Sequence, residues 1–336
     1  MTFAKTVTIG LFMSAFVRSV AQDFTPHIHG TLRSKFEVQT EENESRFMVR
    51  NARVSIDGLV LEKVGYKAEI DLSDEGRIKM LDAYTRLVPV RGLQFTVGQM
   101  RVPFTVDAHR SPHRQYFANR SFIAKQVGNV RDVGATLAYS FNPGFPVVLE
   151  GGLFNGSGLT DQKDYWTKGV NYSAKLQLML PRGFNVTLSG QKISPNGHTV
   201  MMTDGAVAYH GHGWHVEAEY LYKHYSHGAF AAVQAFDGFV NYDIPLRRQG
   251  SMVKKISPLA RFDWMTDHSD GTVDDKGLLK LTDCKRARVT GGVTFSLGLP
   301  FISDIRLNYE KYFYRDGATP KESERDKLVV ELMTRF

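Results

Sequence analysis

The stretch LQFTVGQMRVPF (residues 93–104), TVDAHRSPHRQYFANRSFIAKQVGN (105–129) and VRDVGATLAYSF (130–141) decides the fold. Its two ends have the pattern of β-strands, and a long basic connection joins them. In the second strand the odd-numbered residues from Val133 to Phe141 are apolar, while the even-numbered residues between them are small or polar. Because successive side chains of a strand point to opposite faces, this alternation predicts a strand with one apolar face.

Alternating segments of the same kind continue on both sides of this stretch. The connections after odd-numbered segments, such as 105–129, are mostly long, and those after even-numbered segments, such as 91–92, are mostly short. Three segments have a weaker pattern, namely 203–212, 214–225 and 230–245. The sixteen expected segments are 27–40, 46–62, 64–74, 78–90, 93–104, 130–141, 145–157, 169–180, 183–194, 203–212, 214–225, 230–245, 255–267, 285–298, 303–316 and 326–336.

A closed membrane barrel explains this pattern better than a water-soluble β-sandwich, which usually has roughly seven to nine strands. Outer-membrane barrels combine an even strand number with tight turns at one end and longer loops at the other. Backbone groups inside lipid all need partners, so the sheet must close on itself. We therefore predict an all-β fold, a transmembrane antiparallel barrel of sixteen strands whose water-filled bore acts as a channel.

The first 21 residues have the features of a cleaved secretory signal peptide. Lys5 precedes an apolar core, and the small residues Ser19 and Ala21 precede the expected cleavage point. A retained anchor helix is the alternative, which the short apolar core disfavours. The barrel domain is expected to span residues 22–336. The chain has a formal charge of +7, and loss of Lys5 and Arg18 leaves +5.

The basic connection is the candidate selectivity element. Residues 101–131 hold six cations and one acid, so their net charge of +5 equals that of the whole mature chain. A cationic patch in a narrow bore attracts anions, and guanidinium groups match phosphate or carboxylate oxygens. We predict an inward-folded third external loop that contains a short helix. The cations expected to select anions are Arg101, Arg110, Arg114, Arg120, Lys125 and Arg131.

Alternatives to this interpretation remain open. The connection could be a solvated external loop, or its arginines could face lipid headgroups or lipopolysaccharide phosphates. His109 and His113 could add positive charge at lower pH. Cations expected on the lumen wall are matched by acids, and no uninterrupted run of arginines follows the wall. A general anion-preferring pore is therefore favoured over a dedicated phosphate channel.

The sequence gives little support for a metal site, a disulfide or a catalytic site. His210, His212 and His215 could ligate a metal, but polar residues around a glycine turn are the stronger interpretation. The single cysteine, Cys284, excludes an internal disulfide. Neither G-x-S-x-G nor G-x-x-x-x-G-K-[ST] occurs. We expect no enzymatic activity, metal, cofactor or nucleic-acid partner. A structural or adhesin-type barrel and, less favoured, a barrel hydrolase are the competing classes.

Three motifs resemble those of the phosphate-selective porin O and P family. LDAYTRLVPVRGLQFTVGQMRVPF (81–104) resembles its D-A-Y … G-Q-x-[KR]-x-P-F signature, RFMVRNARVSIDG (46–58) resembles its second strand, and Leu153-Phe154-Asn155-Gly156 resembles its F-N-G element. The resemblance implies a sixteen-stranded porin of a Gram-negative outer membrane, usually trimeric and surrounded by lipid and lipopolysaccharide. It also implies passive or facilitated diffusion of small anionic solutes, with phosphate as one candidate.

Overall fold

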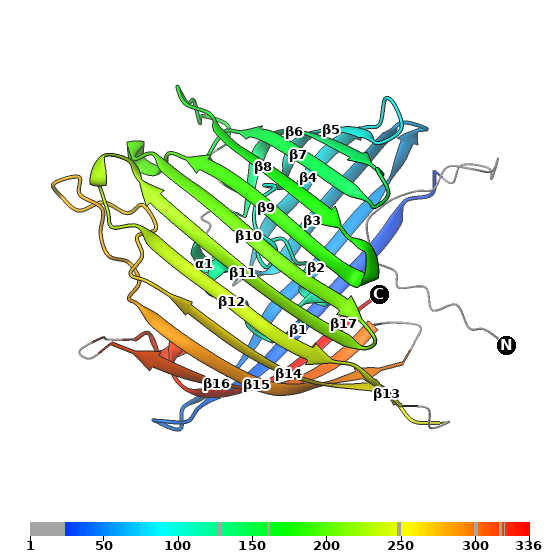
Figure 1. Ribbon diagram of the computed structural model, residues 1–336, viewed down its shortest axis with the longest axis vertical. Coiled ribbons are helices and arrows are strands. Elements are labelled where there is room, and N and C mark those ends of the chain that lie inside the picture. The colour runs from blue at the N-terminus through cyan, green and yellow to red at the C-terminus, as the bar shows by residue number, and fades with distance from the viewer. Residues whose placement is uncertain are drawn as a thin grey trace.

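The computed structural model describes residues 24–74, 76–126, 130–159, 162–246, 250–298, 302–315, 318 and 320–336, so the expected signal peptide at 1–21 lies outside the described residues. No helix among them is long and apolar enough to cross a membrane. The wall is one antiparallel sheet (Figure 1). Its strands are β1 (His27–Gln39), β2 (Ser45–Leu61), β3 (Val64–Asp74), β4 (Arg77–Leu87), β5 (Leu93–Arg101), β6 (Arg131–Phe141), β7 (Val147–Phe154), β8 (Asn171–Met179), β9 (Phe184–Ile193), β10 (Val200–Gly211), β11 (Trp214–Tyr225), β12 (Val233–Tyr242), β13 (Ile244–Pro245), β14 (Val253–Met265), β15 (Arg286–Leu297), β16 (Ile302–Tyr314) and β17 (Lys327–Arg335).

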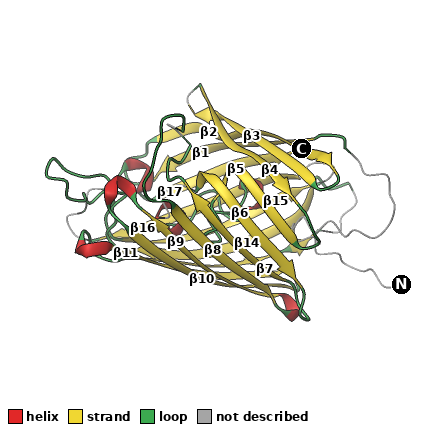
Figure 2. Ribbon diagram, turned by 90° about the horizontal axis from the view of Figure 1, so that it is seen from above, coloured by secondary structure: helices red, strands yellow, loops and turns green. Residues whose placement is uncertain are grey.

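The sheet closes because its first and last strands pair. β1 is hydrogen bonded to both β2 and β17, and at the seam Gly30 N donates to Phe336 O at 2.8 Å. The short β13 pairs with the same β14 as β12 does, so these two segments form one wall strand. The predicted closed barrel of sixteen antiparallel strands is confirmed. Figure 2 shows the molecule from above, with the strands of the wall in yellow.

The alternation of polar and apolar residues in the sequence corresponds to the inward and outward faces of the wall. On β17, Lys327 and Glu331 are 5% and 0% exposed and face the lumen, whereas Leu328 and Leu332 are 42% and 50% exposed and face outward. Outward apolar side chains suit lipid, and inward polar side chains suit an aqueous or hydrogen-bonded interior. Residues two positions apart therefore share a face, and the polar and apolar sets specify the inward and outward faces of the strand.

The connection between β5 and β6 runs inside the barrel, and its residues 102–126 are called the lumen segment below. It contains the short turn η1 (Pro112–Arg114) and the four-residue helix α1 (Ile123–Gln126). Its backbone N–H groups donate to side chains on widely separated wall strands, which places it across the lumen. These bonds are Thr105 N to Ser189 Oγ (3.1 Å), Asp107 N to Glu219 Oε2 (3.0 Å) and Ala118 N to Asn308 Oδ1 (2.8 Å).

An apolar cluster fixes the lumen segment to one part of the wall. Phe122 and Ile123 are fully buried and belong to one cluster with Met202, Leu221 and Met265 from β10, β11 and β14. These three wall residues face inward near the end of the barrel that carries the long connections, called the long-loop end here; the opposite end is the short-turn end. That part of the lumen is consequently filled with packed side chains rather than open.

We expect Phe122→Ala to loosen the lumen segment without opening the barrel. Truncating a buried phenylalanine costs about 3–5 kcal/mol, and here the loss falls on contacts between the segment and the wall. Trypsin should therefore cleave faster after Arg120 in the variant than in the unmodified chain. Phe313→Ala is the matched control, because Phe313 is 51% exposed on the outer face. Equal cleavage rates in all three proteins would contradict the packing role of Phe122.

Candidate pore constriction

The six cations selected from the sequence occupy three kinds of position. Arg101 ends β5 and Arg131 begins β6, so both lie where the lumen segment leaves and rejoins the wall. Arg110, Arg114 and Arg120 belong to the lumen segment itself. The backbone of Lys125 lies in α1, and its side chain is outside the described part of the structure.

Two of these cations are neutralised by carboxylates of the wall. Arg131 donates from Nε to Asp82 Oδ1 at 2.6 Å and lies 3.3 Å from Glu69 Oε1. Arg110 forms an ion pair with Glu217, and its guanidinium lies over the ring of Tyr116, 4.9 Å from the centroid. The electrostatic field of each guanidinium is reduced by the acid beside it.

Arg101 and Arg120 are bound differently, by backbone carbonyls. Arg101 Nη1 donates to Ala108 O at 3.1 Å. Arg120 donates from Nη2 to Arg110 O at 2.7 Å and from Nη1 to Asp107 O. Neither guanidinium makes an ion pair with any residue that the structure describes. Their positive charge is oriented but not cancelled by a contacting carboxylate.

The charge of Arg120 persists at neutral pH in spite of its surroundings. Burial lowers the pKa of Arg120; Asp107 opposes this effect, Arg33 and Arg53 add to it, and the result is a pKa of about 10. Asp107 has the largest charge effect on Arg120, although the carboxylate does not form an ion pair with the guanidinium. Arg114, by contrast, is exposed.

The wall opposite the segment pairs largely with itself, as the sequence predicted. Arg33 Nη2 lies 2.6 Å from Glu331 Oε2, and Arg306 Nη1 lies 2.6 Å from the other oxygen of the same carboxylate. Arg288 contacts both Asp263 (2.6 Å) and Glu310 (3.3 Å). These buried pairs hold the wall together and leave it close to neutral.

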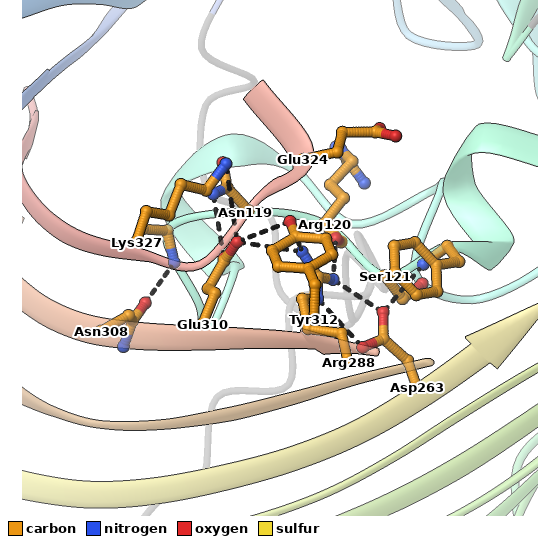
Figure 3. A network of polar contacts seen from close by, with 12 residues as sticks. Asn119, Arg120, Ser121, Asp263, Arg288, Asn308, Glu310, Tyr312, Glu324 and Lys327 are labelled. Carbon is orange, nitrogen blue, oxygen red and sulfur yellow. Dashed lines mark hydrogen bonds and ion pairs between the residues drawn. The ribbon is translucent and has the colours of Figure 1, made fainter. Parts of the chain in front are cut away.

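Figure 3 shows how this wall network positions Arg120. Arg288 Nη2 donates to the carbonyl of Arg120 at 2.8 Å, and Asn119 Nδ2 donates to Glu310 Oε1 at 2.9 Å. Asp263 Oδ2 also accepts the N–H of Phe122 at 3.1 Å. Three consecutive contacts from β14, β15 and β16 thereby fix the backbone around Arg120. Asn119 and Phe122 were not predicted as functional residues, because nothing in the strand alternation distinguishes them.

A cavity of about 690 Å³ lies between the lumen segment and the short-turn end of the barrel. Its volume is within the range of small-molecule sites in proteins, roughly 300–1,000 Å³. Cations, acids and neutral polar groups all line it, so a small hydrated solute meets both signs of charge. Residues from the segment and from the wall contribute, including Arg110, Arg114, Gln115, Tyr116, Lys175, Glu217 and Arg306.

The two histidines of the segment do not behave as the sequence suggested. Burial lowers the pKa of His113 to about 3, and the neighbouring Arg335 and Arg114 add to the effect. Burial and the cations Lys175 and Arg101 also hold the pKa of His109 well below its usual value. Both shifts disfavour the charged ring and so argue against the expectation that these histidines add positive charge at lower pH.

The proposed histidine ligands of the sequence separate into two groups. His212 lies at the turn, where its Nδ1 is 3.1 Å from Tyr209 Oη. His210 and His215 face each other inside the barrel rim. In the described ranges, no group of three or more His, Cys, Asp or Glu side chains is placed to hold a metal ion.

Solved outer-membrane proteins share the fold of the chain. OmpT of Vibrio cholerae, in its trimer form, has a TM-score of 0.59 and 11% identity, with 93% of this chain and 98% of that chain covered. OmpF of Salmonella typhi in complex with daunomycin has a TM-score of 0.61 and 10% identity, with 93% and 97% covered. OprB of Pseudomonas putida has a TM-score of 0.61 and 11% identity, with 92% and 93% covered. At these identities the similarity concerns the fold alone.

Comparison of the sequence with known proteins identifies the family of the chain. No curated protein matches the chain. The family model described as phosphate-selective porin O and P matches residues 27–231, which is more than half of the chain and includes the lumen segment. Family and fold together indicate a channel rather than an enzyme. The chain belongs to the phosphate-selective porin O and P family.

Proposed function

We propose that this outer-membrane porin passes small hydrophilic solutes by diffusion and prefers anions to cations. The observation that supports an anion preference is the difference between paired and unpaired guanidinium groups. Arg110 and Arg131 contact wall carboxylates, whereas Arg101 and Arg120 are bound by carbonyl oxygens alone. Positive charge that no contacting acid cancels lowers the energy of an anion in the lumen and raises that of a cation.

Arg114 and Lys125 complete the proposed set of selectivity residues. Arg114 is exposed and lines the cavity, so a solute in that space can reach it. Lys125 is included on its position in the sequence alone. The remaining members are Arg101, Arg110, Arg120 and Arg131.

A general anion preference is better supported than dedicated phosphate transport. The wall cations Arg33, Arg288 and Arg306 are each neutralised by buried acids. Forked guanidinium groups recognise phosphate when their donors are available to it. Here all three side chains are buried, and both terminal nitrogens of each guanidinium already donate to protein groups. We propose phosphate as one permeant anion among several.

We further propose that the mature porin is a homotrimer in a Gram-negative outer membrane, in contact with lipid and lipopolysaccharide, after export through a cleaved signal at residues 1–21. Trimers occur among proteins of the same fold, such as OmpT of Vibrio cholerae. The outward apolar belt of the barrel fits contact with lipid or with neighbouring subunits.

Recordings in planar bilayers test the proposal. The purified porin should conduct, and its reversal potential in a salt gradient should indicate anion preference. Chloride and phosphate compared in the same bilayer would rank the anions. Cation preference, or no conductance from correctly folded protein, would overturn the proposed function.

Arg101→Gln and Arg120→Gln should each reduce the anion preference. A guanidinium about 8 Å from a passing ion contributes roughly 1 kcal/mol at an effective dielectric constant of about 40. Its loss should therefore lower the anion-to-cation permeability ratio several-fold, which the reversal potential reports. Arg325→Gln removes the same charge from an ion pair with Glu42 outside the lumen and is the control. Equal shifts in all three variants would show that the effect is one of total charge, not of lumen position.

His113 should contribute no charge to the lumen between pH 7 and pH 5. The lowered pKa, about 3, means that the ring takes up a proton only when the pH falls through that lower value. His113→Asn should therefore show the same pH dependence of reversal potential as the unmodified porin in this window. A growing difference between the two as the pH falls would indicate that His113 becomes protonated in the open lumen.

A further inference from the structure

The hairpin of β10 and β11 places two histidines opposite each other at the short-turn end. Its two-residue turn consists of His212 and Gly213, both with positive φ (52° and 85°), as the tight hairpin turns of twisted sheets require. The turn fixes the register so that His210 is the cross-strand partner of His215. Directly opposed side chains on one face of an antiparallel pair lie close enough to share a ligand.

The two imidazoles have an unusual arrangement of hydrogen-bond partners. His210 Nδ1 and His215 Nδ1 are 2.9 Å apart. On the far side of each ring a carboxylate faces Nε2: Asp243 Oδ2 is 3.2 Å from His215, and Glu217 Oε1 is 3.6 Å from His210. Asp243 accepts a hydrogen bond from Nε2 of His215, which leaves Nδ1 of that ring without a hydrogen. Glu217 is too far from His210 for a hydrogen bond, but its negative charge favours the hydrogen on Nε2 of that ring as well. The two Nδ1 lone pairs then point at each other, and they repel unless a cation lies between them.

We propose that His210 and His215 bind one divalent transition-metal ion, such as Zn²⁺, Ni²⁺ or Cu²⁺, through their Nδ1 atoms. Imidazole nitrogen is a preferred ligand of all three ions. A carboxylate behind the second nitrogen is the usual partner of a metal-ligating histidine, because it fixes the tautomer and raises the basicity of the ring. With Zn–N bonds of about 2.0–2.1 Å and a tetrahedral angle at the ion, the two Nδ1 atoms would lie about 3.4 Å apart. The rings must therefore separate by roughly half an ångström and turn so that both lone pairs point at the ion.

The charged groups around the pair do not oppose this ion. Arg110 and Lys255 are the cations nearby, and each is already paired, with Glu217 and with Asp243 at 2.9 Å respectively. The four charges sum to zero. Because two protein ligands converge rather than three, water or a solute group completes the coordination, and the ion exchanges readily.

The position of the histidine pair lets an ion reach it from solution and lets the bound ion influence the conductance. Both histidines line the cavity between the lumen segment and the short-turn end, so metal ions enter from the solution at that end. A bound divalent ion there narrows the cavity and places positive charge beside the exit from the constriction. Metal ions added on the short-turn side should therefore reduce the conductance for cations more than that for anions.

Binding is tested directly, without relying on conduction. Calorimetric titration of the detergent-solubilised porin with Zn²⁺ should show one site, and Cu²⁺ should give an electron paramagnetic resonance spectrum with two equivalent nitrogen couplings. His210→Asn and His215→Asn should each abolish the site, and Asp243→Asn should weaken it by about 10–100-fold, as loss of a carboxylate behind a ligating histidine does. His212→Asn is the matched control and should bind as the unmodified porin does.

The outcomes separate this site from the proposed function. Zn²⁺ binding that survives the double replacement of His210 and His215, or no binding to a correctly folded porin, overturns the metal site and leaves anion preference untouched. Retained binding in a porin that does not conduct would overturn the proposed function and leave the metal site standing.

Discussion

The position of the lumen segment depends on one buried guanidinium, that of Arg288. The side chain is almost completely buried, lies between Asp263 and Glu310, and packs over the ring of Phe122 at 4.7 Å. A buried charge is tolerated when contacting charges and hydrogen bonds compensate it, and breaking such a cluster leaves an uncompensated ion. The same carboxylates accept hydrogen bonds from the segment. The same buried ion cluster therefore stabilises the wall and fixes the position of the segment.

Apolar packing also holds the segment. Phe122 and Ile123 pack against apolar side chains of β10, β11 and β14, which excludes water from that part of the lumen. Ionic contacts and apolar packing meet at Phe122, and together they fix the segment to the wall. It forms a partition in the barrel rather than a free loop, and the remaining space lies toward the short-turn end.

The electrostatic effect of a charged side chain in the lumen depends on the groups that it contacts. A count of cations assigns equal weight to Arg101, Arg110, Arg120 and Arg131, yet two of these four are cancelled by acids from strands distant in sequence. Glu217 approaches Arg110 from β11, and Asp82 approaches Arg131 from β4. In the proposed function, the anion preference of the pore follows from the two cations without a contacting acid, Arg101 and Arg120. The same logic explains why the carbonyl ligands of Arg120 matter: they orient a charge without neutralising it.

The sequence by itself determined the barrel, its strand number and the place of the lumen segment in the chain, because two-residue periodicity and turn spacing are local properties that lipid enforces on every strand. Its weak pattern at β10–β12 has a physical reason: inward residues such as Met202 and Leu221 are apolar there, since they pack against the segment. What only the tertiary structure decided is which charges meet. The pairing of Arg110 with Glu217, the burial of His113 and the opposition of His210 and His215 depend on contacts across the closed sheet, which no local pattern encodes.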